Sequence, residues 1–180
     1  MPRRFRLSRR TLAPALVGLL LAAGFGLYLF QPWKAFTSTT VDEALPSASA
    51  PSMRESGTST ARPAAPRDLA EGRFVTHEHT TSGTARTVRL ADGGQVLRLE
   101  DLKTSEGPDV RVYLSPRDAG AVTTGLGAGA VELGKLKGNL GNQNYAVPNG
   151  TDLSKFRSAV IWCARFSVPF GAANLAPAAG

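Results

Sequence analysis

The stretch "SAVIWCARFSVPF", residues Ser158 to Phe170, has the composition of a core β-strand and contains the chain's only cysteine, Cys163. Its Val, Ile, Trp and Phe residues favour strands that pack on a buried surface. Free cysteine is often a small buried apolar side chain, whereas a lone thiol can also be a redox centre, a metal ligand or half of an intermolecular disulfide. The residues alone leave these interpretations of Cys163 open.

Short alternating segments surround this stretch. "TVRL" and "VLRLEDL" flank residues 92–94, Asp-Gly-Gly, which is a strong hairpin signal. Leu97 and Leu99 alternate with Arg98 and Glu100, so we expect one buried and one wet face. "GRFVTHE", "VRVYL", "VELGKL", "NYAVP" and "VPFGAANL" predict further strands, and "AGAVTTGLGAGA" predicts a glycine-rich loop. This spacing predicts an all-β fold, an antiparallel sandwich or barrel of about 110 residues.

The N-terminal part predicts a membrane anchor. Residues 1–11 contain five arginines, and the 19 residues of Leu12–Phe30 carry no charge. At ~1.5 Å per residue, a helix of this length roughly matches the hydrocarbon core of a bilayer. The arginines place residues 1–11 in the cytoplasm and the rest of the chain outside it, in a single-pass topology. Trp33 and Lys34 follow where an interfacial anchor is expected.

Two alternatives concern the same segment. A cleaved signal peptide has a shorter apolar region that ends in small residues, whereas this run ends in "LYLF". "SRRTLA", residues 8–13, resembles a twin-arginine export signal. Both alternatives also place the remainder of the chain outside the cytoplasm.

Residues 31–66 are rich in Ser, Thr, Ala and Pro, which predicts a disordered linker before a folded domain at residues 67–180. The formal net charge is +7, of which residues 1–66 contribute +5 and residues 67–180 only +2. The basic excess therefore lies mainly before the domain. This distribution favours membrane topology and argues against a nucleic-acid surface.

The two histidines, His77 and His79, would point to the same face of a strand. A copper electron-transfer site would combine them with Cys163 and an axial Met, but Met1 and Met53 lie outside the domain. No CxxCH motif for covalent haem is present, and no Asp, Glu and His cluster predicts a zinc or calcium site. We therefore predict no metal site. Hydrolysis by a Cys–His pair has no local signature to support it.

The segment "KLKGNLGNQNYAVP", residues 135–148, is rich in amides that could bind a sugar or a polar partner. Asn and Gly are also the usual residues of turns. We favour the turn interpretation here, and we expect Asp109, which follows Pro108, to fix a turn as well.

The order of four segments resembles the DM-thirteen domain, also called the electron-transfer DM domain. They are "GRFVTHEHTTSGTA", "VLRLEDLKTSEGPDVRVYLS", "LGKLKGNLGNQNYAVP" and "DLSKFRSAVIWCARFSVPFGAANL". The resemblance runs from about Leu69 to Leu175. It implies an extracytoplasmic β-sandwich-like module, distantly similar to the DOMON group of haem- and sugar-binding domains.

The resemblance also assigns residues. The family's cysteine, proposed to act in redox transfer, falls on Cys163, and its H-x-x-S-G motif falls on His79, Ser82 and Gly83. "GPD" and "GNQNY" match at Gly107–Asp109 and Gly141–Tyr145. The candidate binding residues are His79, Asp109, Asn142, Gln143 and Tyr145.

Two functions follow as hypotheses. In the first, the chain is a membrane-tethered, extracytoplasmic electron-transfer module that uses the Cys163 thiol and a protein redox partner. Arg165, expected on the same strand face, could favour the thiolate. In the alternative, the chain is a non-catalytic surface module for a protein or glycan, and Cys163 is buried and structural. The sequence favours an electron-transfer or binding module over a stand-alone enzyme, and it identifies no cofactor or oligomeric state.

Overall fold

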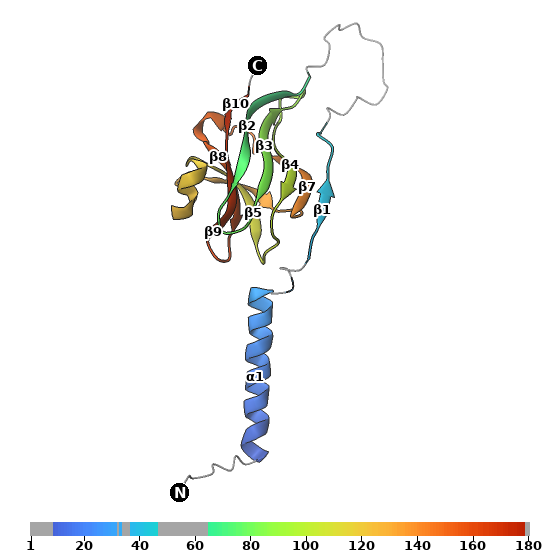
Figure 1. Cartoon of the computed structure of the whole chain (residues 1–180), viewed down its shortest axis with the longest axis vertical. Coiled ribbons are helices and arrows are strands. Elements are labelled where there is room, and N and C mark those ends of the chain that lie inside the picture. The colour runs from blue at the N-terminus through green and yellow to red at the C-terminus, as the bar shows by residue number, and fades with distance from the viewer. Residues whose placement is uncertain (1–8, 32, 34–36, 47–64, 179–180) are drawn as a thin grey trace.

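The computed structural model describes residues 9–31, 33, 37–46 and 65–178, which form one long helix and one β domain (Figure 1). The elements are α1 (Arg9–Phe30), β1 (Thr40–Asp42), β2 (Arg67–Thr76), β3 (Ser82–Arg89), β4 (Gln95–Lys103), β5 (Val110–Ser115), the 3₁₀ helix η2 (Ala119–Thr124), β6 (Val131–Lys135), β7 (Leu140–Ala146), the 3₁₀ helix η3 (Leu153–Lys155), β8 (Ser158–Cys163), β9 (Val168–Asn174) and β10 (Ala176–Pro177). The hairpin predicted around residues 92–94 is confirmed, because that turn joins β3 to β4.

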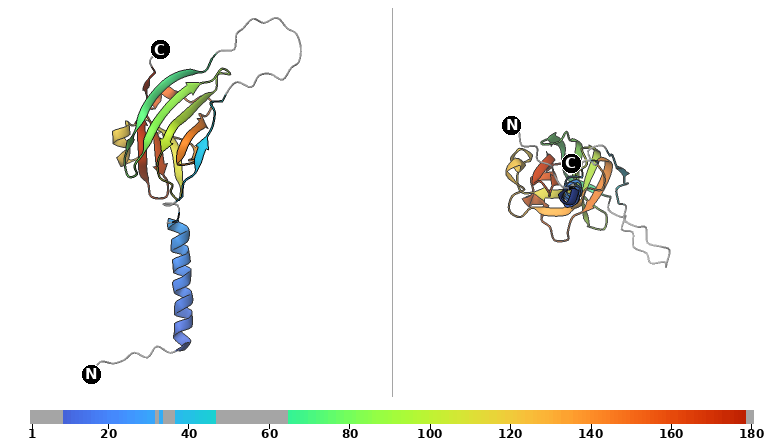
Figure 2. Two further views of the ribbon diagram at one scale, coloured as in Figure 1. Left: turned by 45° about the vertical axis from the view of Figure 1, so that its right-hand side comes forward. Right: turned by 90° about the horizontal axis from the view of Figure 1, so that it is seen from below.

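The strands form one curled ten-stranded sheet, a half-barrel, in the order β1-β7-β4-β3-β2-β9-β8-β5-β6, with β10 paired to β2 (Figure 2). The mostly β fold is confirmed, but these strands form one continuous sheet instead of a two-sheet sandwich. β2 belongs to both halves, since residues 67–73 pair with β3 and residues 74–76 pair with β9. Gly72 lets β2 pass close to Asn174 of β9 near the point where β2 changes partner, because a Cβ at position 72 would overlap the carbonyl oxygen of Asn174.

The concave side of the sheet holds the main core. Leu97 and Leu99 are fully buried there, as their alternation predicts. On the convex side, however, Arg98 is only 8% exposed, so the prediction of a wet face is wrong at this position. Its Nη1 donates to the carbonyl oxygen of Glu43 (3.0 Å) and to Oδ1 of Asn144 (2.9 Å). A segment from before the predicted domain therefore covers the arginine.

A smaller core lies on the convex side of β8 and β9. Val122 of η2 packs there with Val160 and Trp162. The predicted glycine-rich loop is therefore partly helical, because a buried apolar residue within it fixes a short turn of helix against the sheet.

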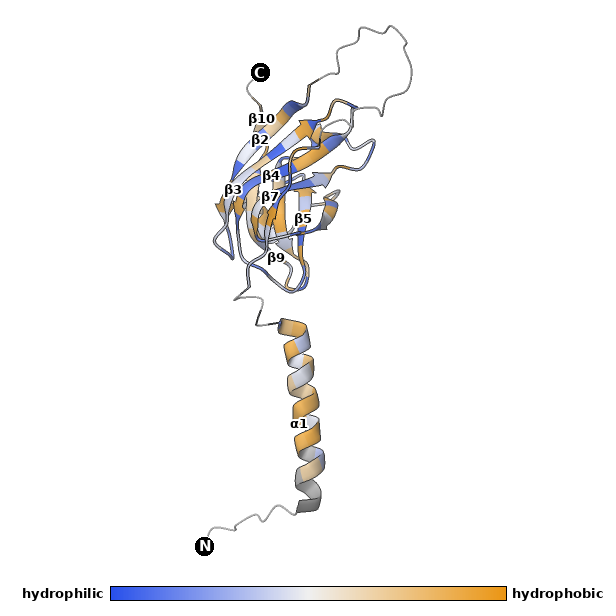
Figure 3. Cartoon of the chain, turned by 90° about the vertical axis from the view of Figure 1, so that its right-hand side faces the viewer, coloured by the Kyte–Doolittle hydropathy of each residue, from blue (hydrophilic) through white to orange (hydrophobic). Residues whose placement is uncertain are grey.

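Helix α1 exposes apolar side chains along its length, including Leu19, Leu21 and Phe25 (Figure 3). Within the described residues, no helix has the length and apolarity needed to cross a membrane. The transmembrane anchor at Leu12–Phe30 therefore stays a prediction. Most of the predicted cytoplasmic tail, residues 1–8, lies outside the described residues.

Part of the predicted linker, residues 31–66, is a strand. β1 pairs in parallel with β7, and Thr40 lies opposite Leu140. The linker prediction is wrong for residues 37–46, whereas residues 47–64 lie outside the described part of the chain. Composition does not predict β1, because this strand is held by backbone pairing with β7 and its side chains offer little apolar surface.

Two contacts hold β1 against β7. Gly141 has a φ of +97°, and a Cβ at this position would overlap the carbonyl oxygen of Val41, so β1 can approach only because the side chain is absent. The carboxylate of Glu43 accepts a hydrogen bond from the Asn144 amide (2.8 Å) and pairs with Lys137 (2.7 Å). The Lys137 ammonium is the main cause that lowers the pKa of Glu43.

We predict that Gly141→Ala destabilises the domain more than Gly93→Ala does. Both glycines have positive φ, which costs an alanine ~1–2 kcal/mol. Gly93 is surrounded by open space, whereas the alanine at position 141 would also displace β1, at a further cost of at least ~1 kcal/mol. Urea unfolding of the two variants measures the difference. Equal losses would contradict the assigned contact between β1 and β7.

Candidate functional site

Four connections form the end of the half-barrel that faces α1, here called the helix-proximal end (Figure 1). They join β2 to β3, β4 to β5, β6 to β7 and β8 to β9. Cys163 is the last residue of β8, Asp109 directly precedes β5, and His79 lies in the β2–β3 connection. The fold therefore brings these three predicted residues to the same end of the sheet.

Cys163 is free and fully buried in the main core. It lies opposite Val110 of β5 and Val168 of β9. The Ala164 amide donates to the carbonyl oxygen of Asp109 (2.8 Å), so the adjoining Cys163–Val110 pair is the non-hydrogen-bonded kind, whose side chains are closest. Val110 therefore packs directly beside the thiol.

Arg165 does not share a strand face with Cys163. β8 ends at Cys163, and residues 164–167 form a turn in which the arginine is exposed. The prediction is wrong because it extended the strand beyond its true end.

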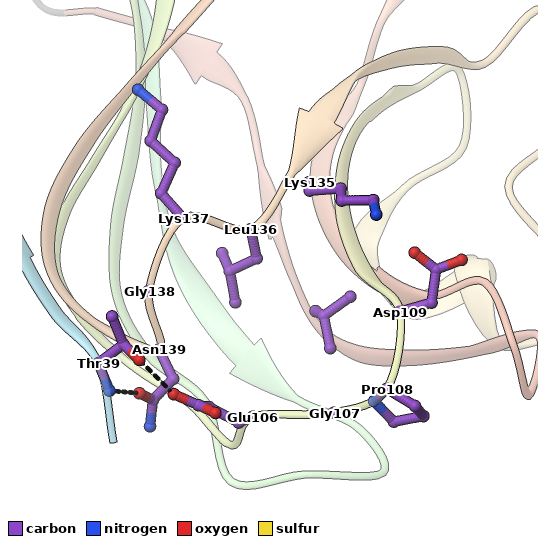
Figure 4. Close-up of a pocket in the computed structure, with 11 residues that line it drawn as sticks. Thr39, Glu106, Gly107, Pro108, Asp109, Lys135, Leu136, Lys137, Gly138 and Asn139 are labelled. Carbon is purple, nitrogen blue, oxygen red and sulfur yellow. Dashed lines mark hydrogen bonds between the residues drawn. The ribbon is translucent and has the colours of Figure 1, made fainter. Parts of the chain in front are cut away.

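A cavity of about 210 Å³ lies beside the connection from β6 to β7 (Figure 4). These two strands follow each other in the chain but do not pair in the sheet, and we call the region between them the seam. Its walls are Thr39, residues 106–110 and residues 135–139. The side chain of Leu136 projects between the two longer wall segments (Figure 4). Val110 belongs both to this wall and to the pair that covers Cys163. The cavity thus adjoins the layer of side chains that buries the thiol.

Asp109 lines this cavity, but its carboxylate is paired with Arg111, with Oδ1 2.9 Å from Nε. Arg111 also pairs with Glu132 at 2.6 Å, and the two acids raise the pKa of the guanidinium. Tyr113 donates to Glu132 (2.8 Å), which is the main cause that lowers the pKa of that carboxyl. Asp109 therefore anchors the start of β5.

Gln143 and Tyr145 point into the protein and support the cavity wall. Tyr145 donates its hydroxyl to Oε1 of Gln143 (2.7 Å), and Gln143 donates from Nε2 to the carbonyl oxygen of Gly138 (2.6 Å). The Lys137 amide donates to Oε1 of Gln143 (3.2 Å) and to the hydroxyl of Tyr145 (3.1 Å). Burial raises the pKa of Tyr145 to about 12. These polar groups are satisfied by the chain itself, so they fix the β6–β7 connection.

Asn142 ties β1 to β4. Its Nδ2 donates to Oδ1 of Asp42 (2.7 Å), and its Oδ1 accepts from the Asp101 amide (3.0 Å). Asp101 has a φ of +49° at an irregularity in the pairing of β4 with β7. The amides of the GNQNY segment therefore bind the protein's own backbone and side chains, in line with the interpretation that they build local structure.

The two histidines lie after β2 and contact different partners. Nε2 of His77 is 2.9 Å from the carbonyl oxygen of Ala119, and the His79 ring lies against Phe170 with centroids 3.9 Å apart. Their expected position on one strand face is wrong, since β2 ends at Thr76. Among the described residues, no three His, Cys, Asp or Glu side chains are grouped so that they could hold a metal ion.

A hydrogen-bond network that the sequence did not reveal joins three of the connections. Thr81 donates to the carbonyl oxygen of His79 (2.9 Å) and lies 2.9 Å from the Thr104 hydroxyl. Asn139 donates to the carbonyl oxygen of Thr104 (3.0 Å) and accepts from the Thr39 amide (2.7 Å). Single threonines carry no sequence signal for such a role. The network locks the helix-proximal end to the segment that leads into β1.

Comparison with known proteins places this β domain in a family. The family described as Electron transfer DM13 matches residues 73–175, which is more than half of the chain. The chain therefore belongs to the electron transfer DM13 family, as the order of its motifs predicts. No curated protein and no solved structure matches the chain.

We predict that Tyr145→Phe costs ~1 kcal/mol of stability at neutral pH, because Gln143 and the Lys137 amide lose a buried partner. A raised tyrosine pKa contributes stability that is fully present below pH ~10 and is lost as pH rises through about 12. The variant should therefore show a shallower alkaline loss in urea unfolding measured from pH 9 to 12.

Tyr113→Phe is the matched control, because its hydroxyl binds the exposed carboxylate of Glu132 outside the core. We expect a smaller loss at neutral pH for this variant. An equal or larger loss would contradict the buried role of Tyr145.

Proposed function

We propose that this chain is a membrane-tethered, extracytoplasmic electron-transfer module whose redox group is the Cys163 thiol. The observation that carries the proposal is the family match over residues 73–175, which contains the chain's only cysteine. A family described by electron transfer supports a redox role, and sulfur is the side-chain group best suited to reversible two-electron exchange.

The step open to a lone thiol is thiol–disulfide exchange with a protein partner that carries a disulfide. The Cys163 thiolate attacks one partner sulfur, a mixed disulfide forms, and the other partner sulfur leaves as a thiolate. A second thiolate, from a small-molecule thiol such as glutathione, then attacks the mixed disulfide at the Cys163 sulfur and releases the remaining partner sulfur as a thiolate. The partner disulfide thereby gains two electrons, one from Cys163 and one from the second thiol, and Cys163 is left in a disulfide with that thiol.

The burial of Cys163 means that this exchange needs a local opening of the fold. Toward the seam cavity the cover over the thiol is Val110, which packs against Cys163 and also lines the cavity. β6 and β7, which are consecutive in the chain, are not hydrogen-bonded to each other, and the Leu136 amide bridges the two cavity walls by donating to the carbonyl oxygen of Val110 (2.8 Å). Regions with few backbone hydrogen bonds open at low free-energy cost, so the thiol would be gated there.

Tethering is supported by the arginine-rich residues 1–11 and by the apolar, exposed side chains of α1. In this proposal α1 holds the chain in the cell membrane with residues 1–11 in the cytoplasm and the β domain outside. A lone thiol outside the cytoplasm is then in an oxidising environment, where exchange with disulfides is available.

A second candidate is a non-catalytic binding module in which Cys163 only packs. The complete burial of the thiol favours it. The amides of residues 142–145 are used internally, so the binding surface would be the pocket of about 800 Å³ at the end of the half-barrel away from α1. Leu69, Leu153 and Phe156 give that pocket an apolar wall.

Glutathione disulfide distinguishes the two candidates. We predict that the native full chain forms a mixed disulfide at Cys163, and that Val110→Ala speeds this reaction about tenfold or more. Val112→Ala is the matched control, because Val112 faces the same core two residues further from the cavity wall. Both truncations cost similar stability, roughly 1–3 kcal/mol, but only the first opens the seam. Mass spectrometry of the intact chain follows the reaction.

Equal acceleration in the two variants, in proportion to their lost stability, would mean that Cys163 reacts only through global unfolding. That result would overturn the thiol-based function and leave the binding module.

A further inference from the structure

The exposed large apolar residues in the described part of the β domain lie toward the helix-proximal end. Between residues 65 and 178, the large apolar side chains that are about half exposed are Val75 (48%) and Phe166 (46%). Val75 is the last but one residue of β2, and Phe166 lies in the β8–β9 turn, so both are near the helix-proximal end. Both side chains are therefore available for contact with a partner at that end of the domain.

The β8–β9 turn touches the end of the apolar helix. The Phe166 ring is stacked with the ring of Phe30, the last residue of α1, with centroids 5.9 Å apart and planes inclined by 23°. The neighbouring Arg165 is exposed. Phe166 thus lies beside the point where the helix ends, and a basic residue, Arg165, precedes it in the same turn.

The connection between helix and domain is short and held at its far end. Only nine residues separate Phe30 from Thr40, and β1 is paired with β7 from that point. Before β1, the hydroxyls of Thr37 and Thr39 donate to the carboxylate of Glu106 in the β4–β5 connection (2.7 and 2.6 Å). The domain is therefore held close to the helix end, where a free 36-residue linker would have let it move away.

We propose that the β8–β9 turn docks on the lipid surface of the membrane that holds α1, with Phe166 at the headgroup level and Arg165 beside lipid phosphates. This inference rests on the membrane tethering proposed above. Aromatic rings are favoured at the membrane interface, and each basic residue near an anionic surface adds to binding. The Cys163 end and the seam cavity then face the membrane, so the exchange partner is itself membrane-bound.

The test uses the full chain in vesicles of phosphatidylcholine and phosphatidylglycerol. An environment-sensitive fluorophore is attached through Glu78→Cys, in the β2–β3 connection of the helix-proximal end, or through Asp92→Cys, in the opposite β3–β4 turn, each with Cys163→Ala. Both positions are exposed. We expect headgroup-level doxyl lipids to quench the label at position 78 at least twofold more than the label at position 92. Phe166→Ser with Arg165→Gln should halve that quenching or more.

Three results would overturn the inference. Equal quenching at positions 78 and 92, in chains that stay with the vesicles through alkaline carbonate flotation, would remove the docking alone. Quenching at position 78 that is unchanged by the Phe166 and Arg165 substitutions would also remove it. Release of the chain by carbonate would overturn the membrane tether and the docking together.

Discussion

The pairing of β1 with β7 is the constraint on which the rest of the structure depends. It converts ten residues of low apolar content into part of the fold, and its partner strand has room for it because Gly141 lacks a side chain. Glu43 then links the new edge to Lys137 and Asn144, and its carbonyl oxygen satisfies the buried Arg98. Each hydrogen bond contributes only ~0.5–1.5 kcal/mol, but an unpaired buried guanidinium would cost more.

This pairing also decides where the candidate site faces. Because β1 is paired with β7, the helix-proximal end stays next to α1. The network through Thr81, Thr104 and Asn139 joins three connections of that end to the segment before β1. Cys163 lies inside that end, covered by Val110 at the seam. A buried thiol is inert to bulky reagents in the closed fold. An electron-transfer role for the family and a fully buried thiol in this chain are compatible if the seam opens locally and so controls access to Cys163.

Where burial follows local alternation, the sequence is a sufficient guide. Leu97 and Leu99 lie in the core as the pattern of their strand predicts, and the stretch around Cys163 is a core strand. Prediction fails where a distant segment supplies the contact. The Arg98 guanidinium is covered by Glu43, more than fifty positions away, and nothing in the pattern of its own strand indicates this contact. Gln143 faces inward because it satisfies backbone groups of the preceding connection, a role that composition cannot distinguish from ligand binding.

Amide hydrogen exchange of the full chain tests this constraint most directly. The Glu43 amide donates to the carbonyl oxygen of Asn142 (2.9 Å), and the Leu140 amide donates to that of Thr39 (3.2 Å). We expect peptides covering residues 37–46 to be protected to a degree comparable with β7 and to lose that protection in Gly141→Ala. Exchange of residues 37–46 at the rate of an unfolded chain, with β7 still protected, would contradict it.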